Sequence, residues 1–179
     1  MPKYVAFLRA INVGGHTVKM DHLRRLFEAL GFTNVETFIA SGNVVFDSRS
    51  RNTTSLEQKI EKHLRNSLGY EVRTFVRAPG ELAVVANHKP FSETELKAPG
   101  HTLYVGFLPQ KPGAEAKKKM LSLCCATDDF AVHGREIYWL CRTTFSETTV
   151  SGALIEKVLG MPATLRNINT VRRMAAKYS

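Results

Sequence analysis

The order of short apolar runs and amphipathic stretches is the feature that most limits the folds open to this chain of 179 residues. Four runs rich in Val, Ile and Phe have the length of strands: residues 3–9, 35–40, 43–47 and 71–77. Amphipathic stretches typical of helices separate the first run from the second and the third from the fourth. The first half of the chain therefore predicts the order β-α-β-β-α-β.

The same order returns in the second half, with strand-like runs at 102–108, 129–133, 136–141 and 163–166. A final amphipathic stretch follows, with Asn169 as its predicted N-cap. We therefore predict an α+β fold of two tandem ferredoxin-like halves with a C-terminal helix. Residues 1–77 would form the first half, residues 78–100 a connector with one short helix starting at Pro79, and residues 101–179 the second half with the last helix.

This topology predicts which loops meet. With right-handed crossovers, the strand order in each half is 4-1-3-2. The first two strands then run parallel, so the loop after the first strand lies at the same end of the sheet as the hairpin between the second and third. Residues 9–15 and 41–43 should therefore be neighbours. In the helix between residues 47 and 71, Thr54 and Glu57 have the spacing of a capping box.

Residues in these two loops also carry a family resemblance. Residues 8–15 (LRAINVGG), 30–32 (LGF) and 39–46 (IASGNVVF) resemble the N-terminal signature of the domain-of-unknown-function family 1697 (DUF1697), and residues 166–171 (RNINTV) resemble its C-terminal motif. Ala10 stands where the family usually has Gly, and Ile168 where it usually has Trp. The resemblance implies a tandem ferredoxin-like α+β fold and implies no activity.

The two predicted neighbouring loops form the first candidate site, a ligand-binding set of Arg9, Asn12, Gly14, Gly15, Ser41, Gly42 and Asn43. Glycines let backbone N–H groups approach an anion, and an arginine can contact phosphate or carboxylate in a bidentate manner. The structural alternative is that the glycines serve turns with positive φ and that Arg9 is an ion-pair partner.

The start of the last helix forms the second candidate, a basic surface of Arg166, Asn167, Asn169, Arg172 and Arg173. Backbone N–H groups at a helix start attract anions. The alternative is plain N-capping by the asparagines with solvated arginines.

The net charge of +9 favours an acidic partner. The excess is spread along the chain, with 13 basic and 8 acidic side chains in residues 1–90 and 12 and 8 in the rest. The best hypothesis is a non-catalytic module that binds an anionic ligand, either nucleic acid or a phosphorylated metabolite, at the loops of residues 9–15 and 41–43. One alternative is an enzyme acting on a phosphorylated or carboxylated small molecule, with Ser41 or His16 as proton carrier. The other is a structural protein whose loops form an oligomer interface.

Other signals are weak or absent. The sequence contains no recognised metal-binding or catalytic motif, and we expect neither a metal nor a cofactor. No apolar run is long enough for a membrane span or a signal peptide, so we expect a cytoplasmic protein without membrane contact.

The three cysteines should be reduced and partly buried. Asp128 and Asp129 are interpreted as a solvated turn. Tyr138 and Trp139 would either stack nucleic-acid bases or belong to the core.

Overall fold

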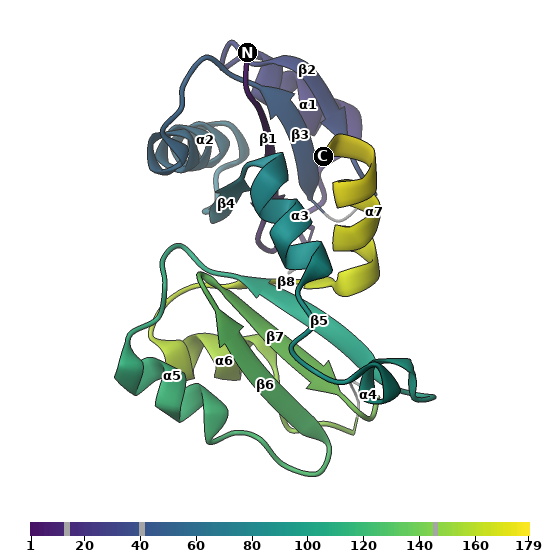
Figure 1. Cartoon of the computed structure of the whole chain (residues 1–179). Coiled ribbons are helices and arrows are strands. Elements are labelled where there is room, and N and C mark those ends of the chain that lie inside the picture. The colour runs from purple at the N-terminus through teal and green to yellow at the C-terminus, as the bar shows by residue number, and fades with distance from the viewer. Residues whose placement is uncertain (13–14, 40–41, 145–146) are drawn as a thin grey trace. The chain divides into compact units, whose positions relative to one another are not determined.

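A computed structural model describes residues 1–12, 15–39, 42–144 and 147–179. The fold is mixed α+β and contains two four-stranded antiparallel sheets (Figure 1). The chain divides into two compact units. The first comprises residues 1–82 together with residues 178–179, and the second comprises residues 83–177.

The first unit contains the predicted β-α-β-β-α-β order. Its elements are β1 (Lys3–Leu8), α1 (Met20–Glu28), β2 (Thr33–Thr37), β3 (Asn43–Asp47), α2 (Thr53–Leu68) and β4 (Thr74–Arg77). The strands lie in the order β2-β3-β1-β4, and each neighbouring pair is antiparallel. The connecting segment then forms α3 (Pro79–Asn87) and α4 (Glu93–Lys97), so the connector contains a second helix that the sequence did not predict.

The second unit repeats this order. Its elements are β5 (Thr102–Phe107), α5 (Ala114–Leu121), β6 (Asp128–His133), β7 (Glu136–Cys141), α6 (Gly152–Leu159) and β8 (Thr164–Asn167), followed by α7 (Ile168–Tyr178). The strand order is β6-β7-β5-β8. The predicted 4-1-3-2 order is therefore confirmed in both sheets.

Two backbone features recur at equivalent places in the two sheets. The N–H of Leu8 donates to the carbonyl oxygen of Gly42 at 2.8 Å, and the N–H of Leu108 donates to the carbonyl oxygen of Arg135 at 3.0 Å. In the same register, Val5 faces Arg77 across β1 and β4, and Val105 faces Arg166 across β5 and β8. Both sheets therefore place an arginine at the same position of the last strand.

Each unit buries one face of its sheet under two helices. In the first unit, alternate residues of β1 (Tyr4, Ala6 and Leu8) pack with apolar side chains of α1 and α2. In the second, Ile137 and Trp139 on β7 pack with side chains of α5 and α6. The period of two along a strand therefore selects the residues that meet the helices.

Two capping predictions were wrong. Asn52, not Thr54, caps α2, because its side chain accepts a hydrogen bond from the N–H of Ser55 at 3.0 Å. Glu57 is buried instead and accepts a hydrogen bond from the N–H of Val76 in β4 at 2.9 Å. At the start of α7, the side chain that accepts the backbone N–H is Asn167, and Asn169 supplies that N–H. Sequence spacing predicted approximately where α2 and α7 begin, but not which side chains cap them.

Gly106 gives the first testable prediction. A Cβ at this position of β5 would lie 2.5 Å from Cγ1 of Ile137 on the paired strand and 3.2 Å from Leu165. We expect Gly106→Ala to lower the free energy of unfolding by about 1–3 kcal/mol, because the added methyl overpacks a filled site. Urea denaturation measures this change.

Gly152→Ala is the matched control for Gly106→Ala. A Cβ at Gly152 would meet only Leu165, at an ordinary 3.8 Å, and this residue starts α6. This control should be neutral or stabilising by up to about 1 kcal/mol, since alanine favours a helix over glycine. Equal destabilisation by both variants would contradict the packing argument.

Candidate functional site

The two loops of the first candidate site meet at the end of the first sheet, as predicted. Besides the bond from the Leu8 N–H to the Gly42 carbonyl, the Cα of Gly42 packs against Ile11: a Cβ there would lie 2.9 Å from Ile11 Cγ2. Gly42 also has a φ of +78°, a left-handed conformation that favours glycine. Gly14 and Ser41, which were also predicted for this site, lie outside the described residues.

Internal hydrogen bonds brace the first of these loops. The Oδ1 of Asn12 accepts a hydrogen bond from the N–H of Val18 at 2.7 Å. The hydroxyl of Tyr70 donates to the carbonyl oxygen of Ile11 at 3.0 Å, and the ring of His16 stacks on Tyr70 with 3.9 Å between centroids. Burial raises the pKa of Tyr70, which keeps this hydroxyl a hydrogen-bond donor.

Asn43 also has an internal partner. Its side chain is fully buried, and its Nδ2 donates to the carbonyl oxygen of Phe38 at 2.9 Å. The N–H of Phe38 in turn donates to the carbonyl oxygen of Asn43. The amide of Asn43 therefore closes the β2–β3 hairpin and does not reach the surface. Arg9 is half-buried, while Gly15 and His16 are exposed.

Ala10 adopts an unusual backbone conformation at this site, with a φ of +57°. An L-residue other than glycine is strained in this region by about 1–2 kcal/mol. The turn after β1 therefore requires the backbone conformation that glycine adopts most easily.

The residues of the second candidate site divide between the interior and the surface. Arg166 is half-buried, and its Nη1 donates to Thr164 Oγ1 at 2.7 Å and to the carbonyl oxygen of Leu165 at 2.9 Å. Burial lowers the pKa of Arg166 to about 10. Arg172 and Arg173 are exposed on α7. Of the three arginines predicted for the basic surface, Arg172 and Arg173 are therefore the more exposed.

Three of the predicted residues (Asn167, Asn169 and Arg172) line one small pocket of the second unit, with a volume of about 130 Å3. His101 lies in its wall, with Nδ1 2.7 Å from the carbonyl oxygen of Glu95. Because that carbonyl can only accept a hydrogen bond, Nδ1 carries the hydrogen of a neutral His101. The pocket thus combines a guanidinium, an imidazole and amide groups at the start of α7.

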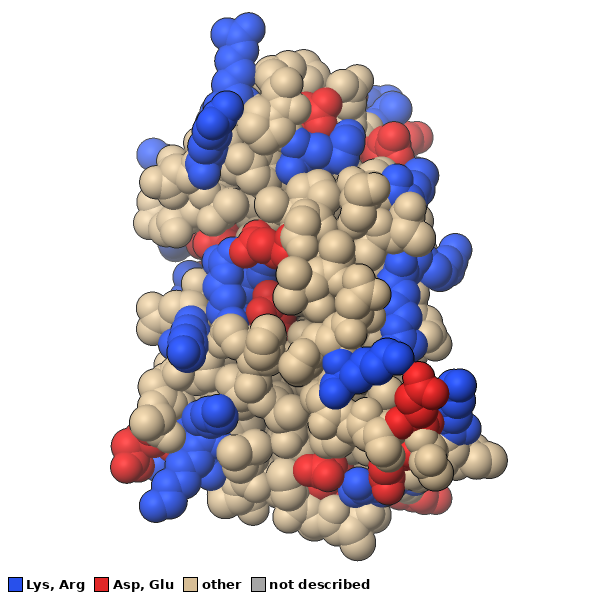
Figure 2. Space-filling model, in the orientation of Figure 1, with Lys and Arg blue, Asp and Glu red and all other residues tan. Residues whose placement is uncertain are grey.

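The Lys and Arg side chains do not gather in one patch on the visible face (Figure 2). Acidic side chains lie between them. This agrees with the even spread of basic residues along the sequence.

Comparison with known proteins places the chain in a family. The model of the family described as Protein of unknown function (DUF1697) matches residues 1–138. The chain belongs to this family. The matched range includes the N-terminal signature and ends before the motif at 166–171.

A solved structure, that of the conserved bacterial protein SP0830 from Streptococcus pneumoniae, has the same fold. The two proteins share 19% sequence identity with a TM-score of 0.73, and the comparison covers 99% of each chain. No curated protein matches the sequence.

In this DUF1697 chain, the two residues expected to form a solvated turn lie in β6, and one of them, Asp128, is the centre of a buried polar cluster. Asp128 is fully buried, and its carboxylate accepts hydrogen bonds from Trp139 Nε1 at 2.8 Å, from Thr148 Oγ1 at 2.8 Å and from Thr127 Oγ1 at 2.8 Å. Burial alone would raise the pKa of Asp128, but these hydrogen bonds outweigh it and lower the pKa. Trp139 is also fully buried and therefore belongs to the core, where no nucleic-acid base can stack on it.

The cysteine prediction was wrong for two of the three residues. Cys141 is buried, but Cys124 and Cys125 are exposed, and all three are free thiols. Cys125 Sγ lies 3.4 Å from Thr127 Oγ1, and hydrogen bonds from Thr127 and Asp128 lower its pKa. Partial burial and the hydrogen bond to Asp129 raise the pKa of Cys124. The pKa values of these two neighbouring thiols are therefore shifted in opposite directions.

Within the described parts of the chain, no group of three or more His, Cys, Asp or Glu side chains is arranged to hold a metal ion. Among the described residues, no helix is both long and apolar enough to cross a membrane.

The contact between the two loops predicts a difference between two glycine variants. Gly42→Ala should destabilise the protein more than Gly15→Ala. Both residues have positive φ, but a Cβ at Gly15 meets nothing within 4 Å. We expect about 1–2 kcal/mol for Gly15→Ala from backbone strain. Gly42→Ala should add about 1–3 kcal/mol from overpacking against Ile11 and Leu8.

Urea denaturation compares the two variants directly. If Gly15→Ala cost as much as Gly42→Ala, the contact with Ile11 would not constrain the loop pair.

The two adjacent thiols predict a pH-dependent order of reactivity. Because the pKa of Cys125 is lowered and that of Cys124 is raised, Cys125 holds more thiolate at neutral pH and should react faster with iodoacetamide. Mass spectrometry of the Cys124→Ser and Cys125→Ser variants, between about pH 6 and pH 10, separates the two thiols.

Buried Cys141 serves as the internal control for this experiment and should react only after unfolding. Faster alkylation of Cys124 at neutral pH would show that the hydrogen bonds to Cys125 do not govern its acidity.

Proposed function

We propose that this chain is a non-catalytic module that binds a phosphate-bearing ligand in the pocket at the start of α7. The observation that carries this proposal is the convergence of Arg172 and Asn169 on one pocket, with no Asp or Glu among the described residues that line it. A guanidinium and an amide can donate hydrogen bonds to an anion. The nearby carboxylate of Glu95, 3.7 Å from His101 Nδ1, does not line the pocket and is held by Arg142 at 2.9 Å. α7 has 11 residues, and its N-terminal end adds the positive end of the helix dipole.

The size of the pocket limits the part of the ligand that it holds. A volume of about 130 Å3 accommodates a phosphate group but lies below the roughly 300 Å3 at which sites for whole small molecules begin. The remainder of the ligand would lie outside the pocket. The phosphate could belong to a phosphorylated metabolite or to a nucleic acid, and the experiments below distinguish these sources.

The loop pair of the first unit is a second candidate site for binding a phosphate-bearing ligand. There, Arg9 and the exposed backbone at Gly15 would contact the anion, while Asn12, Gly42 and Asn43 would hold the loops in position. The repeated element order and strand order also support our inference that each unit is a ferredoxin-like half. A cytoplasmic location fits the three free thiols and remains part of the proposal.

The pocket at α7 predicts the effect of one arginine substitution. Calorimetric titration with inorganic phosphate and with phosphorylated metabolites should detect binding that Arg172→Ala weakens about tenfold or more, because a charge-assisted hydrogen bond contributes about 1.5–3 kcal/mol. Arg173→Ala is the matched control, since Arg173 is the next residue of α7 and does not line the pocket. Equal losses in both variants would point to surface charge rather than to this pocket.

Fluorescence anisotropy with labelled oligonucleotides tests the nucleic-acid source. Binding to single strands should weaken between about 50 and 200 mM salt, with a log–log slope near −0.7 for each phosphate contact. Loss of one contact in Arg172→Ala should make that slope less negative. Binding of metabolites without oligonucleotide binding would assign the pocket to small molecules, and no binding of either class would refute the proposed function.

A further inference from the structure

The first unit contains a larger pocket that no sequence motif indicates. It has a volume of about 460 Å3 and lies between the segment that follows α1, the segment that joins β3 to α2, and the first turns of α2. This volume lies within the range of about 300–1,000 Å3 that is usual for small-molecule sites. All of its lining residues belong to the first unit.

The exposed side chain of Lys59 contributes a positive charge to one wall of this pocket. The Nζ of Lys59 lies 5.4 Å from the centroid of the Phe32 ring and donates a hydrogen bond to the carbonyl oxygen of Leu30 at 3.1 Å. Phe32 is itself nearly buried and stacks on Phe46 with 4.4 Å between centroids. The ammonium group has three N–H donors, so one bond to Leu30 leaves donors that can face a ligand.

Serine hydroxyls line the pocket beside this cation. The Oγ of Ser48 accepts a hydrogen bond from the N–H of Ser50 at 3.2 Å, and the Oγ of Ser50 accepts one from the N–H of Asn52 at 3.3 Å. Because each oxygen acts as an acceptor, its hydroxyl hydrogen is left to donate. Ser55 precedes Lys59 by four residues on α2, so both lie on one face of the helix. The polar part of the pocket is therefore rich in donors.

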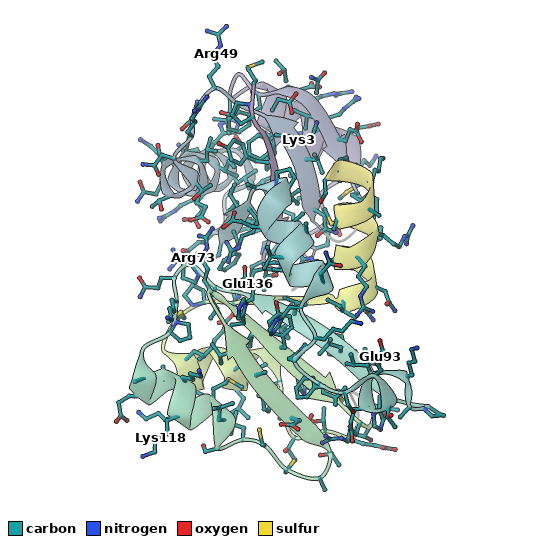
Figure 3. The ribbon with its side chains drawn as sticks, in the orientation of Figure 1. Lys3, Arg49, Arg73, Glu93, Lys118 and Glu136 are labelled. Atoms are coloured by element: carbon teal, nitrogen blue, oxygen red, sulfur yellow. The ribbon has the colours of Figure 1, made fainter. Side chains whose placement is uncertain are left out.

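The charged side chains among the described lining residues are all positive. Arg49 and Lys59 line the pocket, and no Asp or Glu is found among its described lining residues. Asp47 lies next to Ser48 in sequence, but Lys3 at 3.1 Å and Asn34 at 2.8 Å already hold its carboxylate. Figure 3 shows the Arg49 side chain extending away from the ribbon, so its guanidinium would have to swing inward to contact an anion in the pocket.

Apart from Thr33 and Gly31, the remaining lining residues are apolar. Leu56 is buried in the wall from α2, and Leu30 contributes from the segment after α1. A ligand that fills the pocket must therefore have an apolar body as well as an anionic group.

We propose that this pocket binds a small organic anion in which a carboxylate, sulfonate or phosphate is attached to an apolar body. The anionic group would lie against Lys59 and the hydroxyls of Ser48, Ser50 and Ser55, and the apolar body against Leu30 and Leu56. This site is separate from the proposed phosphate site at α7, and neither proposal depends on the other.

The test uses the fluorescent probe 8-anilinonaphthalene-1-sulfonate, which joins an aromatic body to a sulfonate, with the folded full chain. We expect saturable binding at one site, with affinity about tenfold lower in Lys59→Gln, because a charge-assisted contact is lost. Lys62→Gln is the matched control, since Lys62 is exposed on the same helix and does not line the pocket. Arg172→Ala should bind the probe as the wild type does, which separates this test from that of the α7 pocket.

Two further measurements distinguish the pocket from non-specific apolar adsorption. The uncharged analogue N-phenyl-1-naphthylamine should bind at least about tenfold more weakly, because it lacks the group that Lys59 would contact. Ser55→Phe, which fills the pocket from the surface of α2, should block the probe while thermal unfolding shows an intact fold. Equal binding of the uncharged analogue, or unchanged probe binding in both Lys59→Gln and Ser55→Phe, would overturn the proposal.

Discussion

The pairing of one central strand with two neighbours organises each unit. In the first unit, β1 pairs with β3 along one edge and with β4 along the other, and its residues Val5, Ala6 and Phe7 are fully inaccessible to solvent. A strand held on both edges and buried on both faces cannot slip by one residue without turning its apolar side chains. This fixed register brings the turn after β1 to Gly42 and sets the position of the loop pair. The second unit has the same arrangement around β5.

The sequence predicted the scaffold well because its signals are local. The periods of two and of about 3.6 residues identify strands and helices, and the topology follows from short connections and right-handed crossovers. The convergence of the two loops was therefore predictable. The roles of Asn12 and Asn43 were not, because each binds a backbone group brought to it by the folded loop. A polar residue in a turn has the same composition signal whether it binds a ligand or closes the turn.

The features missed by the sequence depend on contacts between distant segments. Asp128 was assigned to a solvated turn, yet its partners Trp139 and Thr148 lie 11 and 20 residues away. The pocket around Lys59 combines three segments, which together contribute ordinary Leu, Phe, Ser and Lys residues. Such residues carry no motif, so only the packing of α1 and α2 beside β3 brings them together. The sequence did predict the distribution of basic side chains, because they are dispersed on the visible surface and along the chain alike.

The hydrogen bond from the Leu8 N–H to the Gly42 carbonyl has an equivalent in the bond from the Leu108 N–H to the Arg135 carbonyl. The two units therefore share a strand framework but carry different loops. After β1, the connection carries glycines, whose backbone N–H groups can turn toward an anion. After β5, the equivalent connection carries Pro109 and Pro112, which have no backbone N–H and a fixed φ. The same framework therefore tolerates turns of opposite stiffness: glycines leave the backbone after β1 free to choose its dihedral angles, whereas prolines restrict it after β5.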